Sequence, residues 1–134
     1  MLGVRTEAQL VGVHPDLVRV IRRAALIGQV DFVVTEGLRK PERQAQLVKS
    51  GASQTMNSRH LTGHAVDLAV KVGGIIRWDW PLYYRLAEIV KLAAKVEKVP
   101  IEWGGDWRKF KDGPHFQLPH KEYPVKLDQK ERQP

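Results

Sequence analysis

Three prolines, Pro15, Pro41 and Pro81, stand where helices can begin, and their placement constrains the fold more than any other feature of the chain. Proline is accepted at the first helical position because its fixed φ suits a helix and the N–H that it lacks would have no partner there. After the first and third prolines, apolar residues recur every three or four positions. The pattern predicts three helices, from Pro15 to Gly28, from Pro41 to near Gly51, and from Pro81 to before Pro100.

Short apolar runs between the predicted helices are typical of strands. In one of them the residues alternate in character around Asp67, so we expect this carboxylate to project from a sheet. Gly73 and Gly74 offer a hairpin turn into the following run. We predict a single α+β domain, with about three helices packed on a small antiparallel sheet. The strands are expected at 32–35, 65–70, 75–78, 101–103 and 115–118.

The length of the chain sets its domain organisation. It has 134 residues, of which 43% are hydrophobic, enough for one modest core and too few for two ordinary domains. We therefore expect residues 1–134 to form one domain, with the charged segment 120–134 as an extended C-terminal tail. The chain has no cysteine, which excludes disulfides and thiolate metal sites and leaves imidazole and carboxylate as metal ligands.

A net charge of +7 and a pI near 9.9 predict an anionic partner, for which nucleic acid, a membrane surface and an acidic cell wall all qualify. Nucleic acid is not expected, because the sequence has no RNA-binding aromatic signature, helix-turn-helix pattern or cysteine zinc finger. No apolar run approaches the length of about 18 residues that a membrane span needs. The segment from Met1 to Glu7 lacks the apolar stretch of a secretory signal, so we expect a protein made in the cytosol.

Two histidines and two aspartates carry the strongest chemical signal. His60 and Asp67 lie in one short segment, and Asp112 and His115 lie in another. Two imidazoles and one carboxylate give Zn²⁺ three protein ligands and leave a fourth position for a water, whose pKa the metal lowers to about 7. We predict that His60, Asp67 and His115 bind zinc and that Asp112 is the general base.

Several nearby residues keep alternative interpretations. Trp103 and Trp107 are expected in the core or in the wall of a cleft. Asp106 either caps a turn or orients a ligand histidine through its second ring nitrogen. Gly63 is expected to allow a close backbone approach or an unusual dihedral, and His64 is not expected to be a ligand.

From about Pro15 to Leu118 the sequence resembles the zinc D-Ala-D-Ala metallopeptidase family, and most closely its phage endolysin branch, the L-alanyl-D-glutamate peptidases. Further agreement lies in Glu36-Gly37-Leu38-Arg39 and in Trp103-Gly104-Gly105-Asp106-Trp107. The central pattern is Ser-x-His-x-x-Gly-x-Ala-x-Asp followed by a later histidine, carried here by Ser58, His60, Gly63, Ala65, Asp67 and His115.

The resemblance implies the fold shared by hedgehog proteins and D-Ala-D-Ala peptidases, and it implies roles for two further residues. Arg39 is expected near the substrate, where it would polarise the scissile carbonyl or hold a carboxylate. Ser58 is expected to support the substrate pocket. Carboxypeptidase and dipeptidase members usually have a glutamate three residues before the last histidine and a tryptophan directly before it. This chain has Asp112 and Pro114 there, which favours the endolysin branch.

The resulting hypothesis is a zinc endolysin that cuts the L-Ala-D-Glu bond of peptidoglycan stem peptides during phage-induced host lysis. The enzyme would be a monomer, held in the host cytoplasm until it is released to the cell wall. Two alternatives stay open. The chain could be a D-Ala-D-Ala carboxypeptidase or dipeptidase of the same family, or a non-catalytic, zinc-stabilised module that binds the cell wall.

Overall fold

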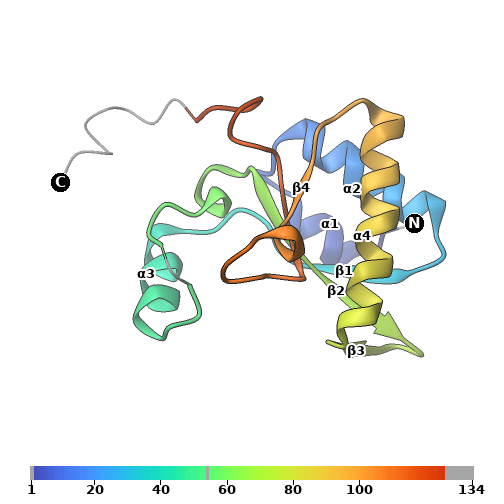
Figure 1. Cartoon of the computed structure of the whole chain (residues 1–134), viewed down its shortest axis with the longest axis horizontal. Helices are drawn as coiled ribbons and strands as arrows, with labels where there is room; N and C mark the ends of the chain where they lie inside the picture. The colour runs from blue at the N-terminus through green and yellow to red at the C-terminus, as the bar shows by residue number, and fades with distance from the viewer. Residues whose placement is uncertain (1, 54, 126–134) are drawn as a thin grey trace.

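The computed structural model describes residues 2–53 and 55–125, which form helices packed on one antiparallel sheet (Figure 1). The sheet has the order β1-β2-β5-β4, and β3 pairs with β2. The predicted α+β class is confirmed. The helices are α1 (Val4–Gln9), α2 (Pro15–Ile27), α3 (Pro41–Lys49) and α4 (Trp80–Glu97), with 3₁₀ turns η1 (Arg59–Thr62) and η2 (Gly104–Asp106). The strands are β1 (Asp31–Glu36), β2 (Ala65–Val72), β3 (Ile75–Arg77), β4 (Glu102–Trp103) and β5 (His115–Gln117).

The prolines start the helices as predicted. Pro15 is the first residue of α2, and the side chain of His14 caps this helix by accepting a hydrogen bond from the Asp16 N–H. Gly28 ends α2 with a φ of 74°, which glycine adopts without steric cost. The helices α2 and α4 lie against each other (Figure 1), and their buried faces supply half of the residues of the apolar core.

The long central strand β2 divides the core from the site. Val66, Leu68 and Val70 belong to the apolar core, so the alternation of a strand sends Asp67 to the other face, as predicted. Gly73 and Gly74, with φ of 59° and 80°, form the predicted two-residue hairpin between β2 and β3. On the same edge as β3, and opposite β1, the start of β2 pairs with β5, and this register sets Asp67 opposite His115.

Helix α1 was not predicted. It has six residues, too few to show a helical period, and its one buried side chain is the polar Thr6. The Thr6 hydroxyl accepts a hydrogen bond from the Val34 N–H at 3.1 Å, which joins α1 to β1. Tertiary contact rather than sequence pattern therefore defines this helix.

The segment after β5 begins as a turn. The Tyr123 N–H donates to the Pro119 carbonyl at 2.9 Å, and the Tyr123 hydroxyl donates to Asp16 at 2.7 Å. The Arg59 guanidinium donates to the carbonyls of Leu118 and Tyr123 at 2.7 and 2.9 Å. The first part of the predicted tail is therefore bound to the domain by hydrogen bonds. Its remainder, 126–134, lies outside the described residues. In the described part of the chain no helix is both long and apolar enough to span a membrane.

Candidate metal centre

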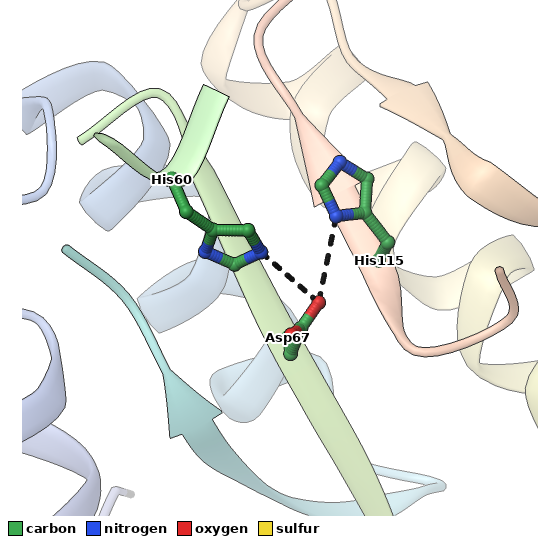
Figure 2. A group of neighbouring side chains, drawn as sticks. All are labelled: His60, Asp67 and His115. Carbon is green, nitrogen blue, oxygen red and sulfur yellow. Dashed lines mark hydrogen bonds and ion pairs between the residues drawn. The ribbon is translucent and has the colours of Figure 1, made fainter. Parts of the chain in front are cut away.

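Three side chains from separate elements converge on one point, as Figure 2 shows: His60 from η1, Asp67 from β2 and His115 from β5. Ser58 caps η1 by accepting a hydrogen bond from the His60 N–H at 3.2 Å, which fixes the start of this turn. Asp67 and His115 are cross-strand partners, so their side chains leave the same face of the sheet. The structure brings together all three residues predicted as metal ligands.

The spacing of these ligand atoms matches a tetrahedral metal site. His60 Nε2 lies 3.2 Å and His115 Nδ1 lies 3.4 Å from the same Asp67 oxygen, Oδ1, and all three ligand atoms lie within 4.8 Å of one another. Two ligands bound to one zinc ion at about 2.0–2.1 Å in a tetrahedron lie about 3.3–3.4 Å apart. The group can therefore hold a metal ion, and its nitrogen and oxygen donors suit zinc.

The second nitrogen of each ring has its own partner. His60 Nδ1 lies 2.8 Å from the Gly37 carbonyl oxygen, which can only accept, so this nitrogen carries a proton. His115 Nε2 lies 2.7 Å from the side-chain oxygen of Gln117. In the neutral rings the lone pairs then lie on His60 Nε2 and His115 Nδ1, both facing Asp67. Three electron donors that face one point suit a cation between them, either a metal ion or, without one, protons carried by the rings.

Burial makes the need for a positive charge stronger, because His60 and His115 are only 1% and 6% exposed. Burial acts to raise the pKa of Asp67, but hydrogen bonds to His115 and His60 and their charges outweigh it and hold this pKa well below its usual range. Burial likewise opposes a charge on His115, yet the hydrogen bond to Asp67 raises the pKa of that imidazole. Asp67 is therefore an anion at neutral pH.

Asp112 stands beside this group on the irregular segment between β4 and β5. Its backbone is held by two hydrogen bonds, from its own N–H to the Gly104 carbonyl at 3.0 Å and from the His115 N–H to its carbonyl at 3.2 Å. A Cβ on Gly104 would lie 2.4 Å from the Asp112 carbonyl oxygen, so this approach requires glycine. Burial, followed by the negative charge of Asp67, raises the pKa of Asp112, which suits a carboxylate that must take and release a proton.

Arg39 lies behind Asp67 in a polar network. One guanidinium nitrogen, Nη2, donates to Glu36 at 2.6 Å and to Asp67 Oδ2 at 3.4 Å. The other, Nη1, donates at 2.8 Å to Gln44, whose side chain is fully buried and donates in turn to Ser53 at 2.8 Å. The charge of Arg39 therefore acts first on the ligand Asp67. Its predicted contact with substrate stays a prediction, as does that of Ser58.

A cleft of about 550 Å³ opens over the metal group. One wall comes from α3 and the loop after it, and the other from the segment after β4, which includes Trp107 and Phe110. The cleft is lined by all six residues predicted for the site: Arg39, Ser58, His60, Asp67, Asp112 and His115.

The structure also decides between the alternatives left by the sequence. Trp103 is in the core, whereas Trp107 lines the cleft and its ring lies 5.0 Å from that of His115. Asp106 orients no ligand histidine, because its carboxylate pairs with Lys91 at 2.6 Å. The residue that does so is Gln117, which the sequence interpretation missed although it lies two positions after His115 on the same strand face.

Gly63 behaves as expected. It has a φ of 76°, and a Cβ there would lie 2.2 Å from the Gly12 carbonyl oxygen. The ring of His64 faces away from the metal group, 5.4 Å from the ring of His14 and in hydrogen-bond contact with Thr62. Burial, followed by the nearby cation Arg59 and the ring of His14, lowers the pKa of His64.

Comparison with known proteins identifies the family. The sequence profile of the phage L-alanyl-D-glutamate peptidases matches residues 1–118, which include every residue of the site. The chain belongs to this family. The predicted recognition is confirmed, and with it the prediction of an enzyme of the hydrolase class.

Individual relatives agree with the family. An L-alanyl-D-glutamate peptidase of Listeria phage A118 is 42% identical over 94 residues, which are 70% of this chain and 32% of that protein. The chain thus spans about a third of the length of this relative. The crystal structure of the Serratia marcescens L-Ala D-Glu endopeptidase ChiX is 51% identical, with a TM-score of 0.87 over 91% of this chain and 92% of that one.

A more distant structure shares the fold alone. It is a vancomycin resistance D,D-dipeptidase, VanXYg, with 20% identity and a TM-score of 0.53 over 83% of this chain and 53% of that one. The predicted likeness to D-Ala-D-Ala peptidases is therefore present in the fold, while sequence identity is higher to the L-alanyl-D-glutamate branch.

Proposed function

We propose that this chain is a zinc-dependent endolysin peptidase that hydrolyses the bond between L-alanine and D-glutamate in peptidoglycan stem peptides. The observation that carries the proposal is the convergence of His60, Asp67 and His115 on one point in a cleft, beside Asp112, in a chain of this family. The names of the family and of its relatives supply the substrate. The donor set and its spacing support zinc.

His60, Asp67 and His115 would hold the ion. When bound, zinc would supply an electrophile that polarises the scissile carbonyl and makes water more acidic. The protein's own contribution is orientation, because Gly37 and Gln117 fix the two ring tautomers and Arg39 holds the second oxygen of Asp67. These partners are needed whichever peptide is cut.

Asp112 moves the proton. Among the described residues its carboxylate has no hydrogen-bond donor of its own, although it lines the cleft. It can accept a proton from the attacking water and return it to the leaving nitrogen as the peptide bond breaks. Its raised pKa favours the first half of this exchange, because a weaker acid has a conjugate base that takes up a proton more readily.

Arg39 and Ser58 line the cleft, and we propose that both also meet the substrate. Arg39 places a positive charge beside the group where negative charge develops on the carbonyl oxygen. Ser58 already uses its hydroxyl to cap η1, so its contact with substrate would come in addition to this structural role.

The biological setting follows from charge and family. The net charge of +7 favours the anionic cell envelope, an attraction that should weaken with added salt. We propose a monomer held in the host cytoplasm until it reaches the cell wall at lysis. Its partner would be peptidoglycan, without nucleic acid and without stable membrane insertion.

Digestion of purified peptidoglycan tests metal, reaction and bond together. The protein is incubated with wall fragments as purified, with a chelator, and with chelator followed by excess zinc, and the products are identified by mass spectrometry. We expect fragments with a new D-glutamate amino terminus, their loss on chelation and their return with zinc. Free D-alanine would instead establish the carboxypeptidase or dipeptidase alternative. Wall binding without any cleavage would establish the non-catalytic module.

A further inference from the structure

A second, smaller pocket of about 230 Å³ adjoins the cleft and has an aromatic lining. Its walls include Trp78, Trp80 and Tyr83, together with Lys111. The two indoles are 59% and 42% exposed and lie beside each other in one pocket, so they present a grouped aromatic surface rather than scattered apolar residues. Trp78 lies parallel to Tyr83, with ring centroids 6.0 Å apart and 5° between their planes, so the two form a flat stack.

The aromatic pocket is fixed to the catalytic segment. A Cβ on Gly113 would lie 3.2 Å from the ring of Trp80, so the backbone of this segment packs directly on the indole. On its other side the Trp103 indole N–H donates to the Gly113 carbonyl at 2.7 Å. Tyr83 is anchored as well, because its hydroxyl donates to the Arg77 carbonyl at 2.8 Å. The pocket is therefore preformed, with rigid side chains.

Asp112 lines both the aromatic pocket and the cleft over the metal group, so the two hollows are neighbours that share this residue. The opposite end of the cleft has a different character. Among the described residues of α3 and the loop after it, the lining is polar or aliphatic and includes the exposed cation Arg43, with no aromatic ring. A substrate that crosses the metal group thus meets a cation on one side and aromatic faces on the other.

We propose that the aromatic pocket binds a sugar ring of the glycan strand to which the stem peptide is attached. This inference rests on the proposed function. In peptidoglycan the L-alanine is joined through a lactyl group to an N-acetylated sugar, while the D-glutamate side carries free carboxylates. The carboxylate-bearing part suits Arg43, which leaves the sugar on the aromatic side. The C–H groups on the face of a pyranose ring carry partial positive charge and pack against the negative face of an indole, and Lys111 can donate to a sugar oxygen.

A pair of substrates separates a sugar subsite from general damage. The wild type and Trp78→Ala are compared on a stem peptide that carries its disaccharide and on the same peptide without sugar. We expect Trp78→Ala to lower kcat/KM about five- to tenfold on the sugar-bearing substrate and to leave it unchanged on the free peptide. Tyr84→Ala is the control, since Tyr84 is an aromatic residue near the start of α4 that is 53% exposed but does not line the pocket. Trp78→Phe should recover part of the loss.

Equal kcat/KM for wild type and Trp78→Ala on the sugar-bearing substrate, or an equal loss on both substrates, would overturn the proposal. A direct titration with a soluble tetramer of β-1,4-linked N-acetylglucosamine, followed by tryptophan fluorescence, is independent of cleavage. We expect saturable quenching in the wild type and in Tyr84→Ala, and in Trp78→Ala an affinity about five- to tenfold weaker, reported by Trp80. If the wild type cuts neither substrate, the proposed function fails, and the titration alone decides whether the pocket binds sugar.

Discussion

Two groups of residues at the cleft are held in position by different interactions. The first group, which we call the sheet wall, consists of Asp67, His115 and Gln117. Their positions follow from backbone pairing, because Asp67 and His115 are register partners on β2 and β5 and Gln117 is on the same strand as His115. No side-chain contact is needed to bring the two metal ligands together, since the hydrogen bonds of the strands already do so.

The second group, which we call the α3 wall, consists of Arg39, Gln44 and Ser53. These positions depend on a chain of side-chain hydrogen bonds that runs from Asp67 through Arg39 to Gln44 and on to Ser53. A buried polar network of this kind is stable when every member has a partner, and it loses much of its stability when one is removed. We therefore expect a substitution in the α3 wall to disturb the hydrogen bonds of that wall more than it disturbs the positions of the metal ligands.

The largest effect is expected at Asp112, which belongs to neither wall. Asp112→Asn removes the proton acceptor while it keeps the size of the side chain and leaves both walls intact. We expect kcat on peptidoglycan to fall by about 10²- to 10⁴-fold, with zinc content and melting temperature close to the wild type. A variant that lysed wall fragments at the normal rate would remove Asp112 from the mechanism.

The second-largest effect is expected at Gln117, the residue of the sheet wall whose side chain supports the metal ligand His115. Gln117→Leu deprives His115 Nε2 of its acceptor, which lies 2.7 Å away, and frees the ring to change tautomer. We expect zinc affinity, measured by competition with a chromogenic chelator, to fall about 10- to 100-fold, with little change in melting temperature of the metal-free protein. Gln117→Glu keeps an acceptor at this position and should retain more of the affinity than Gln117→Leu does. Equal affinities for both variants would show that register alone orients His115.

The same contrast explains what the sequence could and could not predict. The strand that carries Asp67 was predictable, because the alternation around Asp67 and the glycine pair after it define a strand and its hairpin from local pattern, whereas the role of Gln117 was missed. The helices that begin at Pro15, at Pro41 and one residue before Pro81 were predictable for the same reason. Local pattern carries this information because neighbouring residues alone determine the period.

The α3 wall was not predictable in this way. Arg39 and Asp67 are 28 positions apart, and the bond between them depends on how the loop before α3 returns over the sheet. The resemblance to a family placed Arg39 near the site, but Glu36 and Gln44 as its partners could only be seen in the structure. Helix α1 was missed because one buried hydroxyl leaves no periodic signal.

A smaller effect is expected from breaking the α3 wall at its centre. Gln44→Leu fits the same buried space but leaves Arg39 Nη1 and the Ser53 hydroxyl without their present partner. Loss of a buried hydrogen-bond partner costs about 1–3 kcal/mol, so we expect the free energy of unfolding in urea to fall by about that amount. Zinc affinity should change less than in Gln117→Leu. A larger loss of zinc affinity in Gln44→Leu would mean that the α3 wall, not the sheet, positions Asp67.

The smallest effect is expected at Asp16, which belongs to neither wall. A variant at this position shows whether activity is lost at low pH because the protein unfolds or because the site changes. The hydrogen bond from Tyr123, then that from Arg19, lowers the pKa of Asp16, and the charge of His14 acts in the same direction. A group whose pKa is depressed on folding stabilises the protein above its unfolded value, near 3.9, and this stabilisation is lost as the pH falls through the lower folded pKa. Asp16→Asn should therefore lower the melting temperature by roughly 3 °C at pH 7, and the difference from the wild type should shrink below about pH 4. Tyr123→Phe removes the same hydrogen bond from the other side and should show the same trend. If the difference stayed constant down to pH 3, Asp16 would contribute through its shape rather than its charge, and acid inactivation would have to be traced to the cleft.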